Sequence, residues 1–103
     1  MVKHVNETEF KDVAASGVVV VDFSATWCGP CKMLAPVYDE ASEDMADKAT
    51  FLKVDIDESP NLAQQYGIVS VPSVVVLKDG VRVDMTVGFQ PKEAIVQFVE
   101  KNL

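Results

Sequence analysis

The chain is short of several residue types on which whole classes of protein depend. Its 103 residues include two cysteines, one histidine, one tryptophan and nine basic side chains. Two cysteines are too few for the disulfide framework that holds small secreted domains together. Nine basic against sixteen acidic side chains give a formal charge of −7, which opposes binding to phosphate backbones. The composition therefore argues against a secreted disulfide scaffold and against a nucleic-acid partner.

Long apolar segments are also missing. The longest purely aliphatic run, Val18 to Val21, is far too short to cross a bilayer, and the first ten residues lack the apolar core of a signal peptide. We therefore expect a cytoplasmic protein with no membrane partner. A hydrophobic content of 49% is enough to fill one core, and no linker or repeat divides the chain. The sequence predicts a single domain over residues 1–103.

The hydrophobic periodicity predicts strands and helices in the order βαβαβαββα. Strands are expected at 2–5, 18–23, 50–56, 73–77 and 81–87, the last two joined by an Asp-Gly turn; helices are expected from Asn6 to near Gly17, after Trp27 to about Lys48, from Pro60 to Gly67, and from Gln90-Pro91 onward. Alternating strands and helices followed by a hairpin favour the α/β class. The predicted architecture is a three-layer α/β/α sandwich with a central mixed five-stranded sheet and four helices.

Several local signals refine these elements. Asn6 and Glu9 have the spacing of a capping box, and Ser59-Pro60 predicts a capping side chain followed by proline at the first helical position. Pro36 falls inside the second helical pattern, where we predict a kink but no break. Apolar and polar residues alternate over 81–87, so that strand is expected to be half exposed.

Both cysteines and the only tryptophan lie in the five residues Trp27 to Cys31. Two thiols separated by two residues can form a disulfide, bind a metal, or lie inert in a core. A closed structural metal site needs four ligands, and the only histidine, His4, is far away in the opening strand. Redox chemistry is therefore favoured over metal binding, while inert buried thiols remain the alternative.

The position of the motif gives its two cysteines different expected roles. Cys28 lies at the start of a predicted helix, where free N–H groups and the helix dipole stabilise a thiolate. Cys31 lies one turn further in and should be more shielded, which suits it to resolve a mixed disulfide. Gly29 is expected to let the backbone turn, and Pro30 stiffens the loop without adding a donor. A weakly stabilised dithiol gives up its electrons readily, so the pair should act as a reductant.

The segment Val21 to Lys32, VDFSATWCGPCK, resembles the active-site strand and turn of the thioredoxin family. The likeness extends over nearly the whole chain, through Pro36, 51–57, 66–68, Val71-Pro72, Asp79-Gly80 and Val87-Gly88. It implies the thioredoxin fold and a general dithiol–disulfide oxidoreductase that reduces disulfides in other proteins. No bound cofactor is implied. The implied recharging partner is a thioredoxin reductase drawing on NADPH, with a ferredoxin-linked reductase as the alternative, and we expect a monomer.

The resemblance also assigns roles within the site. Cys28 matches the attacking cysteine, Cys31 the resolving one, Asp22 the buried carboxylate behind them and Lys53 its neighbour. Burial of Asp22 in an apolar strand would favour its protonated form and let it exchange a proton with Cys31. The alternatives are an aspartate at a strand end that reaches solvent and an ordinary surface lysine.

Substrate contacts are likewise implied by the resemblance. Val71-Pro72 matches the family's cis-proline step, which faces the cysteines and pairs with a substrate strand. The implied docking residues are Trp27, Gly29, Pro30, Val71, Pro72, Val87, Gly88 and Phe89. Core packing is the alternative for Val71 and Val87. Met33 and Met45 are expected to fill the core, and His4 is expected to be exposed and without a role.

Two rival functions remain. The first is an oxidase or isomerase of the same fold, which usually carries histidine where Pro30 stands and an export signal. The second is a binding module that grips a partner through the apolar rim while its redox state is irrelevant.

Overall fold

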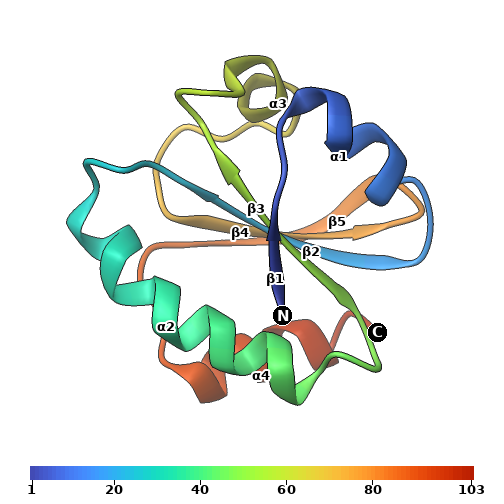
Figure 1. Cartoon of the computed structure of the whole chain (residues 1–103). Helices are drawn as coiled ribbons and strands as arrows, with labels where there is room; N and C mark the ends of the chain where they lie inside the picture. Colours follow the sequence, from blue (N-terminus) through green and yellow to red (C-terminus); the bar gives the residue numbers. More distant parts are fainter.

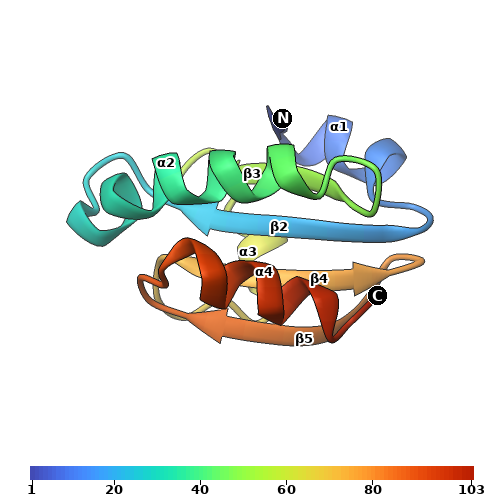
Figure 2. The same ribbon diagram turned by 90° about the horizontal axis from the view of Figure 1, so that it is seen from below.

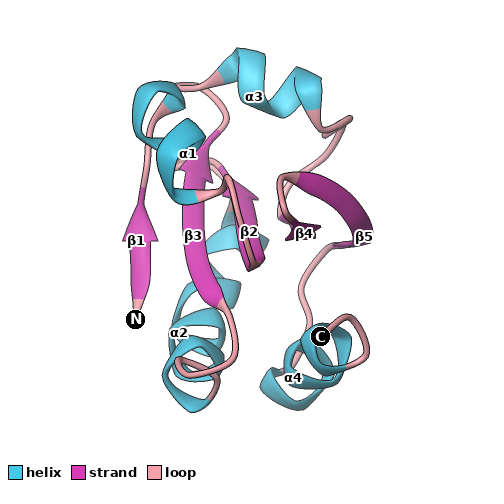
Figure 3. Ribbon diagram, turned by 90° about the vertical axis from the view of Figure 1, so that its right-hand side faces the viewer, coloured by secondary structure: helices cyan, strands magenta, loops and turns pink.

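The chain folds around one five-stranded sheet with helices on both of its faces (Figures 1 and 3). The computed structural model describes all of residues 1–103. Its elements are β1 Val2–His4, α1 Glu7–Val13, β2 Val18–Ser24, α2 Gly29–Asp44, β3 Thr50–Asp55, α3 Pro60–Gln65, β4 Ser73–Lys78, β5 Val81–Val87 and α4 Lys92–Glu100. This order confirms the predicted βαβαβαββα arrangement and the three-layer α/β class. No helix combines the length and apolar character needed to cross a bilayer.

The sheet has the strand order β1-β3-β2-β4-β5 and is mixed. Strands β1, β3 and β2 run parallel, whereas β4 is antiparallel to β2 and β5 is antiparallel to β4. Because β2 and β3 are parallel, the turns that follow them lie at the same end of the sheet, beyond the carboxyl ends of these strands. Helix α2 begins after the turn that follows β2, so its first residues lie at that end of the sheet.

The two faces of the sheet carry separate apolar cores. Val19, Val21 and Phe23 of β2 pack in the cluster that includes Phe10 of α1 and Leu62 of α3. The alternate residue Val20 packs instead in the cluster formed with α2 and α4, which lie together over that face in Figure 2. Side chains alternate between faces along a strand, so Asp22 belongs to the α2 face.

Two predicted helix starts had different outcomes. The capping box is confirmed, because the Glu9 N–H donates to Asn6 Oδ1 at 2.9 Å and the Asn6 N–H donates to Glu9 Oε1 at 3.2 Å. Ser59 occupies the N-cap of α3, but its side chain caps nothing and its hydroxyl is buried without a partner. Its ψ of 63° departs from the extended conformation that aims a capping side chain at the helix. The predicted Ser59 cap is therefore wrong.

Helix α2 continues through Pro36, so the prediction that this proline does not break the helix is confirmed. The predicted kink at Pro36 remains a prediction. Both α1 and α2 end earlier than predicted, at Val13 and Asp44, because the chain turns at each of those points before the next strand begins.

The predicted alternation along β5 is wrong. Val81, Arg82 and Val83 are all exposed, and the next three residues are all half-buried. Pairing with β4 passes from Asp84 opposite Val76 to Arg82 opposite Leu77, so Val83 is an extra residue in an edge strand. Such a bulge resets which face each following side chain points to, and this explains the lost alternation.

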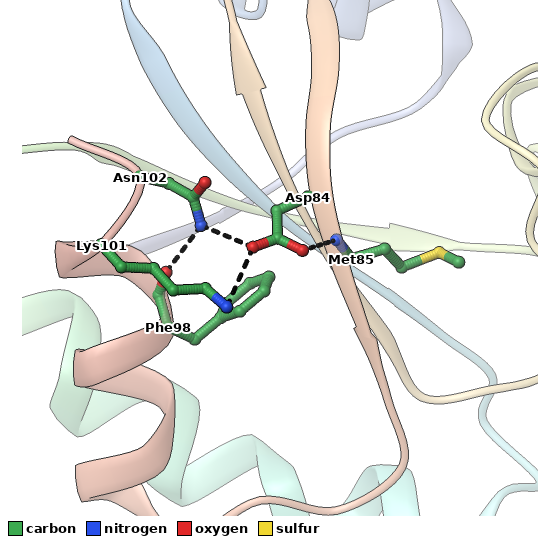
Figure 4. Close-up of polar contacts among 5 residues, drawn as sticks. All are labelled: Asp84, Met85, Phe98, Lys101 and Asn102. Atoms are coloured by element: carbon green, nitrogen blue, oxygen red, sulfur yellow. Dashed lines mark hydrogen bonds and ion pairs between the residues drawn. The ribbon is translucent and has the colours of Figure 1, made fainter.

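Asp84 ties β5 to the C-terminal end of α4 (Figure 4). Its carboxylate accepts hydrogen bonds from Asn102 Nδ2 at 2.9 Å and from the Met85 N–H at 2.9 Å, and it pairs with Lys101 Nζ at 3.3 Å. Asn102 Nδ2 also donates to the Phe98 carbonyl at 2.9 Å. The hydrogen bond from Asn102 is the main reason that the pKa of Asp84 lies below its ordinary value. The ionised carboxylate therefore holds the edge strand against the last helix.

Replacing Asp84 with alanine should lower the free energy of unfolding at pH 7 by about 1–2 kcal/mol, because charge-assisted hydrogen bonds are lost. The loss should shrink as the pH falls through the lowered pKa of Asp84, since the parent carboxylate then protonates. Urea denaturation at several pH values measures this. Asp47→Ala, in the exposed turn after α2, is the control, and equal losses in both variants would contradict the anchoring role.

Candidate active site

The two cysteines lie at the first turn of α2 and are joined by a disulfide. Cys28 is the N-cap residue, with an extended backbone (φ −93°, ψ 115°), and Cys31 lies within the first turn. The Cys31 N–H donates to Cys28 Sγ at 3.2 Å. In the reduced protein the same backbone donor, together with the helix dipole, would stabilise a thiolate on Cys28.

The pair is enclosed, and its two members differ in the predicted direction. Cys28 is 5% exposed and Cys31 is 2% exposed. Ala25 packs with both sulfurs, and Ile56 and Val71 lie against this small cluster. Both cysteines are thus buried, and Cys28 is the slightly more exposed of the two.

A second segment closes the site from the other side. The Val71-Pro72 peptide bond is cis, as the resemblance implied, and the Val71 carbonyl oxygen lies 3.8 Å from Cys28 Sγ. The Pro72 carbonyl accepts a hydrogen bond from the Gly88 N–H at 2.8 Å. Gly88 has a φ of 93°, a backbone region that strongly favours glycine. This bond fixes the segment that carries Val87 and Phe89 beside the cis-proline step.

Asp22 is fully buried on the face of the sheet that α2 covers. Neither of its carboxylate oxygens has a hydrogen-bond partner. Burial raises the pKa of Asp22 to about 6, while the positive charge of Lys53 opposes the increase and the negative charge of Asp39 adds to it. The solvent-exposed alternative for Asp22 is therefore excluded.

Lys53 lies directly opposite Asp22 in the parallel pairing of β2 and β3. It is half-buried, so it is not an ordinary surface lysine. Lys53 also lines an open pocket of about 460 Å³ whose wall includes Cys31. Lys53 is thus the residue in register with the buried carboxyl group that also lines the pocket beside Cys31.

The predicted docking residues differ in exposure: Trp27, Gly29, Pro30, Val87 and Phe89 are exposed, Gly88 is half-buried and Pro72 is buried. Trp27 is 67% exposed, Val87 49% and Phe89 40%, whereas Val71 is half-buried against the disulfide. Core packing is therefore excluded for Val87 and holds only in part for Val71. An exposed apolar rim of this kind beside a redox pair is suited to contact with other proteins.

A comparison with known families gives a match over almost the whole chain. The model of the family described as "Thioredoxin" matches residues 1–101. The chain belongs to the thioredoxin family.

Individual thioredoxins show the same likeness. The thioredoxin of Staphylococcus saprophyticus is 50% identical over 99 residues, which cover 96% of this chain and 95% of that protein. The thioredoxin of Staphylococcus aureus strain Mu50 is also 50% identical, with the same coverage. The solved structure of Malassezia sympodialis thioredoxin superposes with a TM-score of 0.89 at 38% identity, covering 98% of this chain and 90% of that one.

Membership of the thioredoxin family settles the chemistry of the cysteine pair. The pair is redox-active, and the protein is a protein-disulfide oxidoreductase. Its substrates are proteins that contain disulfides, and a reductase recharges it. The chain has no group of three or more His, Cys, Asp or Glu side chains placed to hold a metal ion.

Two residues at the thioredoxin site were missed from the sequence. The Trp27 indole N–H donates to Asp57 Oδ2 at 2.8 Å, and Ile56 packs against the cysteine cluster. Both residues directly follow β3. Because β2 and β3 are parallel, residues after β3 lie beside the residues after β2, and this topological signal could have identified them.

Two other expectations are corrected. Gly29 is not in the left-handed backbone region, and a Cβ added there would meet no atom within 4 Å, so the turn does not need glycine. Met33 is 60% exposed, whereas Met45 is 2% exposed and in the core as predicted. Met33 lies on the outer side of α2, where the helix faces solvent. His4 is exposed, as expected.

Replacing Asp22 with asparagine should stabilise the protein at neutral pH more than at acid pH. The pKa of Asp22 in the folded protein, about 6, lies above its ordinary value of 3.8. With respect to Asp22, the parent protein is therefore most stable below pH 3.8, where the acid is protonated, and it loses stability as the pH rises through about 6. Relative to the parent, the variant should gain about 3 kcal/mol in free energy of unfolding between pH ~4 and pH ~8.

Urea denaturation across this pH range measures the difference between the two proteins. A difference that does not change with pH would show that Asp22 titrates normally, which would contradict the burial argument.

Proposed function

We propose that this protein is a general reductant of protein disulfides in which Cys28 attacks and Cys31 resolves. The observation that carries the proposal is the position of Cys28. It caps α2, receives the Cys31 N–H and is the more exposed of two unequally buried sulfurs. Ionised Cys28 is the better placed nucleophile, since helix N-termini stabilise thiolates.

The reaction proceeds in two exchanges. The Cys28 thiolate attacks one sulfur of the substrate disulfide, forms a mixed disulfide and expels the other substrate sulfur as a thiolate. Cys31 then loses its proton and attacks Cys28 Sγ, which breaks the mixed disulfide and releases the second substrate thiolate. Two electrons pass to the substrate, and the Cys28–Cys31 disulfide remains.

Asp22 is proposed to take the proton from Cys31 in the second exchange. A carboxyl group with a pKa of about 6 is mostly ionised at pH 7, yet basic enough to accept a proton. The Lys53 charge, opposite Asp22 in the sheet, keeps the pKa from rising further. Both residues act behind the sulfurs and not on the substrate directly.

The apolar rim is proposed to bind the substrate chain around its disulfide. Its residues are Trp27, Gly29, Pro30, Val71, Pro72, Val87, Gly88 and Phe89. The Val71 backbone beside Cys28 can pair with an extended segment, as in strand addition, and such main-chain pairing discriminates little by sequence. The open space at Gly29 lets a partner approach the sulfurs closely.

We further propose that the protein acts as a monomer of one domain in the cytoplasm, within electron transport and cell redox homeostasis. Its reductase is proposed to be a thioredoxin reductase that draws on NADPH, in preference to a ferredoxin-linked one. These assignments are supported by membership of the thioredoxin family.

Replacing Cys31 with serine should trap a mixed disulfide between Cys28 and a protein substrate, because nothing remains to resolve it. The matched variant Cys28→Ser should form no adduct, since Cys31 is the more buried sulfur. Non-reducing electrophoresis with a disulfide-containing protein distinguishes the two. Equal trapping by both variants would refute the assigned order of attack, and intact activity without either cysteine would favour a binding module.

The rim proposal is tested with two valines at opposite ends of β5. Val87→Ser should lower kcat/KM for insulin reduction by about fivefold, which corresponds to loss of about 1 kcal/mol of apolar contact. Val81 is 65% exposed at the end of the strand away from the cysteines, so Val81→Ser should have no effect. Equal effects of the two substitutions would remove Val87 from the docking surface.

A further inference from the structure

Three titratable side chains lie in one row across the parallel part of the sheet. His4 of β1 is in register with Lys53 of β3, and Lys53 is in register with Asp22 of β2. Residues in register on parallel strands point to the same face, and neighbouring strands lie about 4.8 Å apart. The row therefore runs about 10 Å, from an exposed histidine at the sheet edge to a fully buried carboxyl group.

The open pocket on the α2 face connects the outer part of this row with the redox pair. Its wall includes His4, Lys53 and Cys31, and its volume is about 460 Å³. Polar side chains and a volume of this size suit water, each molecule of which occupies about 30 Å³ in the liquid. Asp22 is not part of the wall, whereas its neighbour in register, Lys53, is.

The proposed mechanism requires the buried carboxyl group to exchange a proton with solvent in every turnover. Asp22 is 0% exposed and has no hydrogen-bond partner through which a proton could leave. The nearest group in the row is Lys53, and the next is the single imidazole of the chain. Imidazole groups commonly act as proton shuttles because they change charge between about pH 5 and pH 8.

We propose that His4 relays protons between the pocket and solvent. It carries away the proton that Asp22 has received from Cys31. The inference rests on the proposed role of Asp22. In the resolving step the Cys31 thiol proton moves to the Asp22 carboxylate, and the Cys31 sulfur bonds to Cys28 Sγ. The Lys53 ammonium group then gives a proton through pocket water to the His4 imidazole and takes the carboxyl proton of Asp22 in its place, which restores the ionised carboxylate. His4 releases its proton to solvent.

The charges around His4 come from three elements and from the turn before α3. His4 lines two pockets, and Lys53 and Asp55 of β3 line both of them as well. Lys32 of α2 lines the larger pocket. Glu9 of α1 and Glu58, which precedes α3, line the smaller one, of about 150 Å³. Three carboxylates and two ammonium groups thus face the imidazole. His4 itself is exposed, so solvent can receive the proton from it.

A single turnover with an aromatic disulfide tests this directly. Its product thiols must be ionised at pH 7, so that the first exchange releases only the proton of any un-ionised Cys28 and the second releases the proton that Cys31 loses. Both products are coloured. Absorbance reports the second thiolate, and a fluorescent pH indicator in weakly buffered solution reports the proton. The proteins compared are the parent, His4→Gln, Lys3→Gln and Asp22→Asn. Lys3 is the matched control, since it neighbours His4 but is in register with Leu52, which packs on the opposite face.

In the parent and in Lys3→Gln, the proton should appear together with the second thiolate. In His4→Gln it should lag behind the thiolate, with a rate constant about tenfold lower, because the carboxyl group empties slowly. Coincident signals in His4→Gln overturn the inference. If that substitution slows both signals equally, the role of His4 is structural and the inference is again wrong.

Asp22→Asn separates this inference from the function on which it rests. This variant should release the second thiolate slowly, with the proton appearing at the same time, because no carboxylate stores it. If the thiolate appears at the parental rate, the proposed role of Asp22 fails and the role of His4 fails with it. A slow Asp22→Asn combined with coincident signals in His4→Gln overturns only the role of His4.

Discussion

The parallel register of β2 with β3 is the constraint on which the site depends. It places Asp22 opposite Lys53 and puts the turns after both strands at the same end of the sheet. Helix α2 starts at that end with Cys28 as its N-cap, and Ile56, in the turn after β3, packs against the cysteines. A slip of one residue in this pairing would place Asp22 and Lys53 on opposite faces of the sheet. The same pairing thus organises the apolar layers and the chemistry.

Burial of Asp22 opposes stability while serving the reaction. A carboxyl group without a hydrogen-bond partner is destabilising in a protein interior once it ionises. Its surroundings include Lys53, whose charge reduces the penalty, and Tyr38, whose hydroxyl lies 3.0 Å from the Val20 carbonyl and 2.8 Å from the Leu52 carbonyl. The tyrosine joins α2 to both strands next to the acid. Burial keeps the pKa of Asp22 raised, and an acceptor for a thiol proton needs such a pKa.

Periodicity and capping signals were enough to predict the element order, because each depends on neighbours in the sequence. The capping box of Asn6 is an example. Features that depend on distant partners were not predictable in this way. Val83 is exposed because of a bulge set by pairing with β4, and the bond between Trp27 and Asp57 needs two turns to meet. The cis bond before Pro72 was expected from the resemblance alone, since most such bonds are trans.

The register of the sheet buries a carboxyl group behind the redox pair, and burial raises the pKa of that group to about 6. The most direct measurement is a carbon-13 NMR titration of the Asp22 side-chain carboxyl in the oxidised protein. The account predicts a midpoint at about pH 6. A midpoint near the ordinary value of 3.8 would contradict it, because the group would then be solvated or paired and could not serve as the proton acceptor for Cys31.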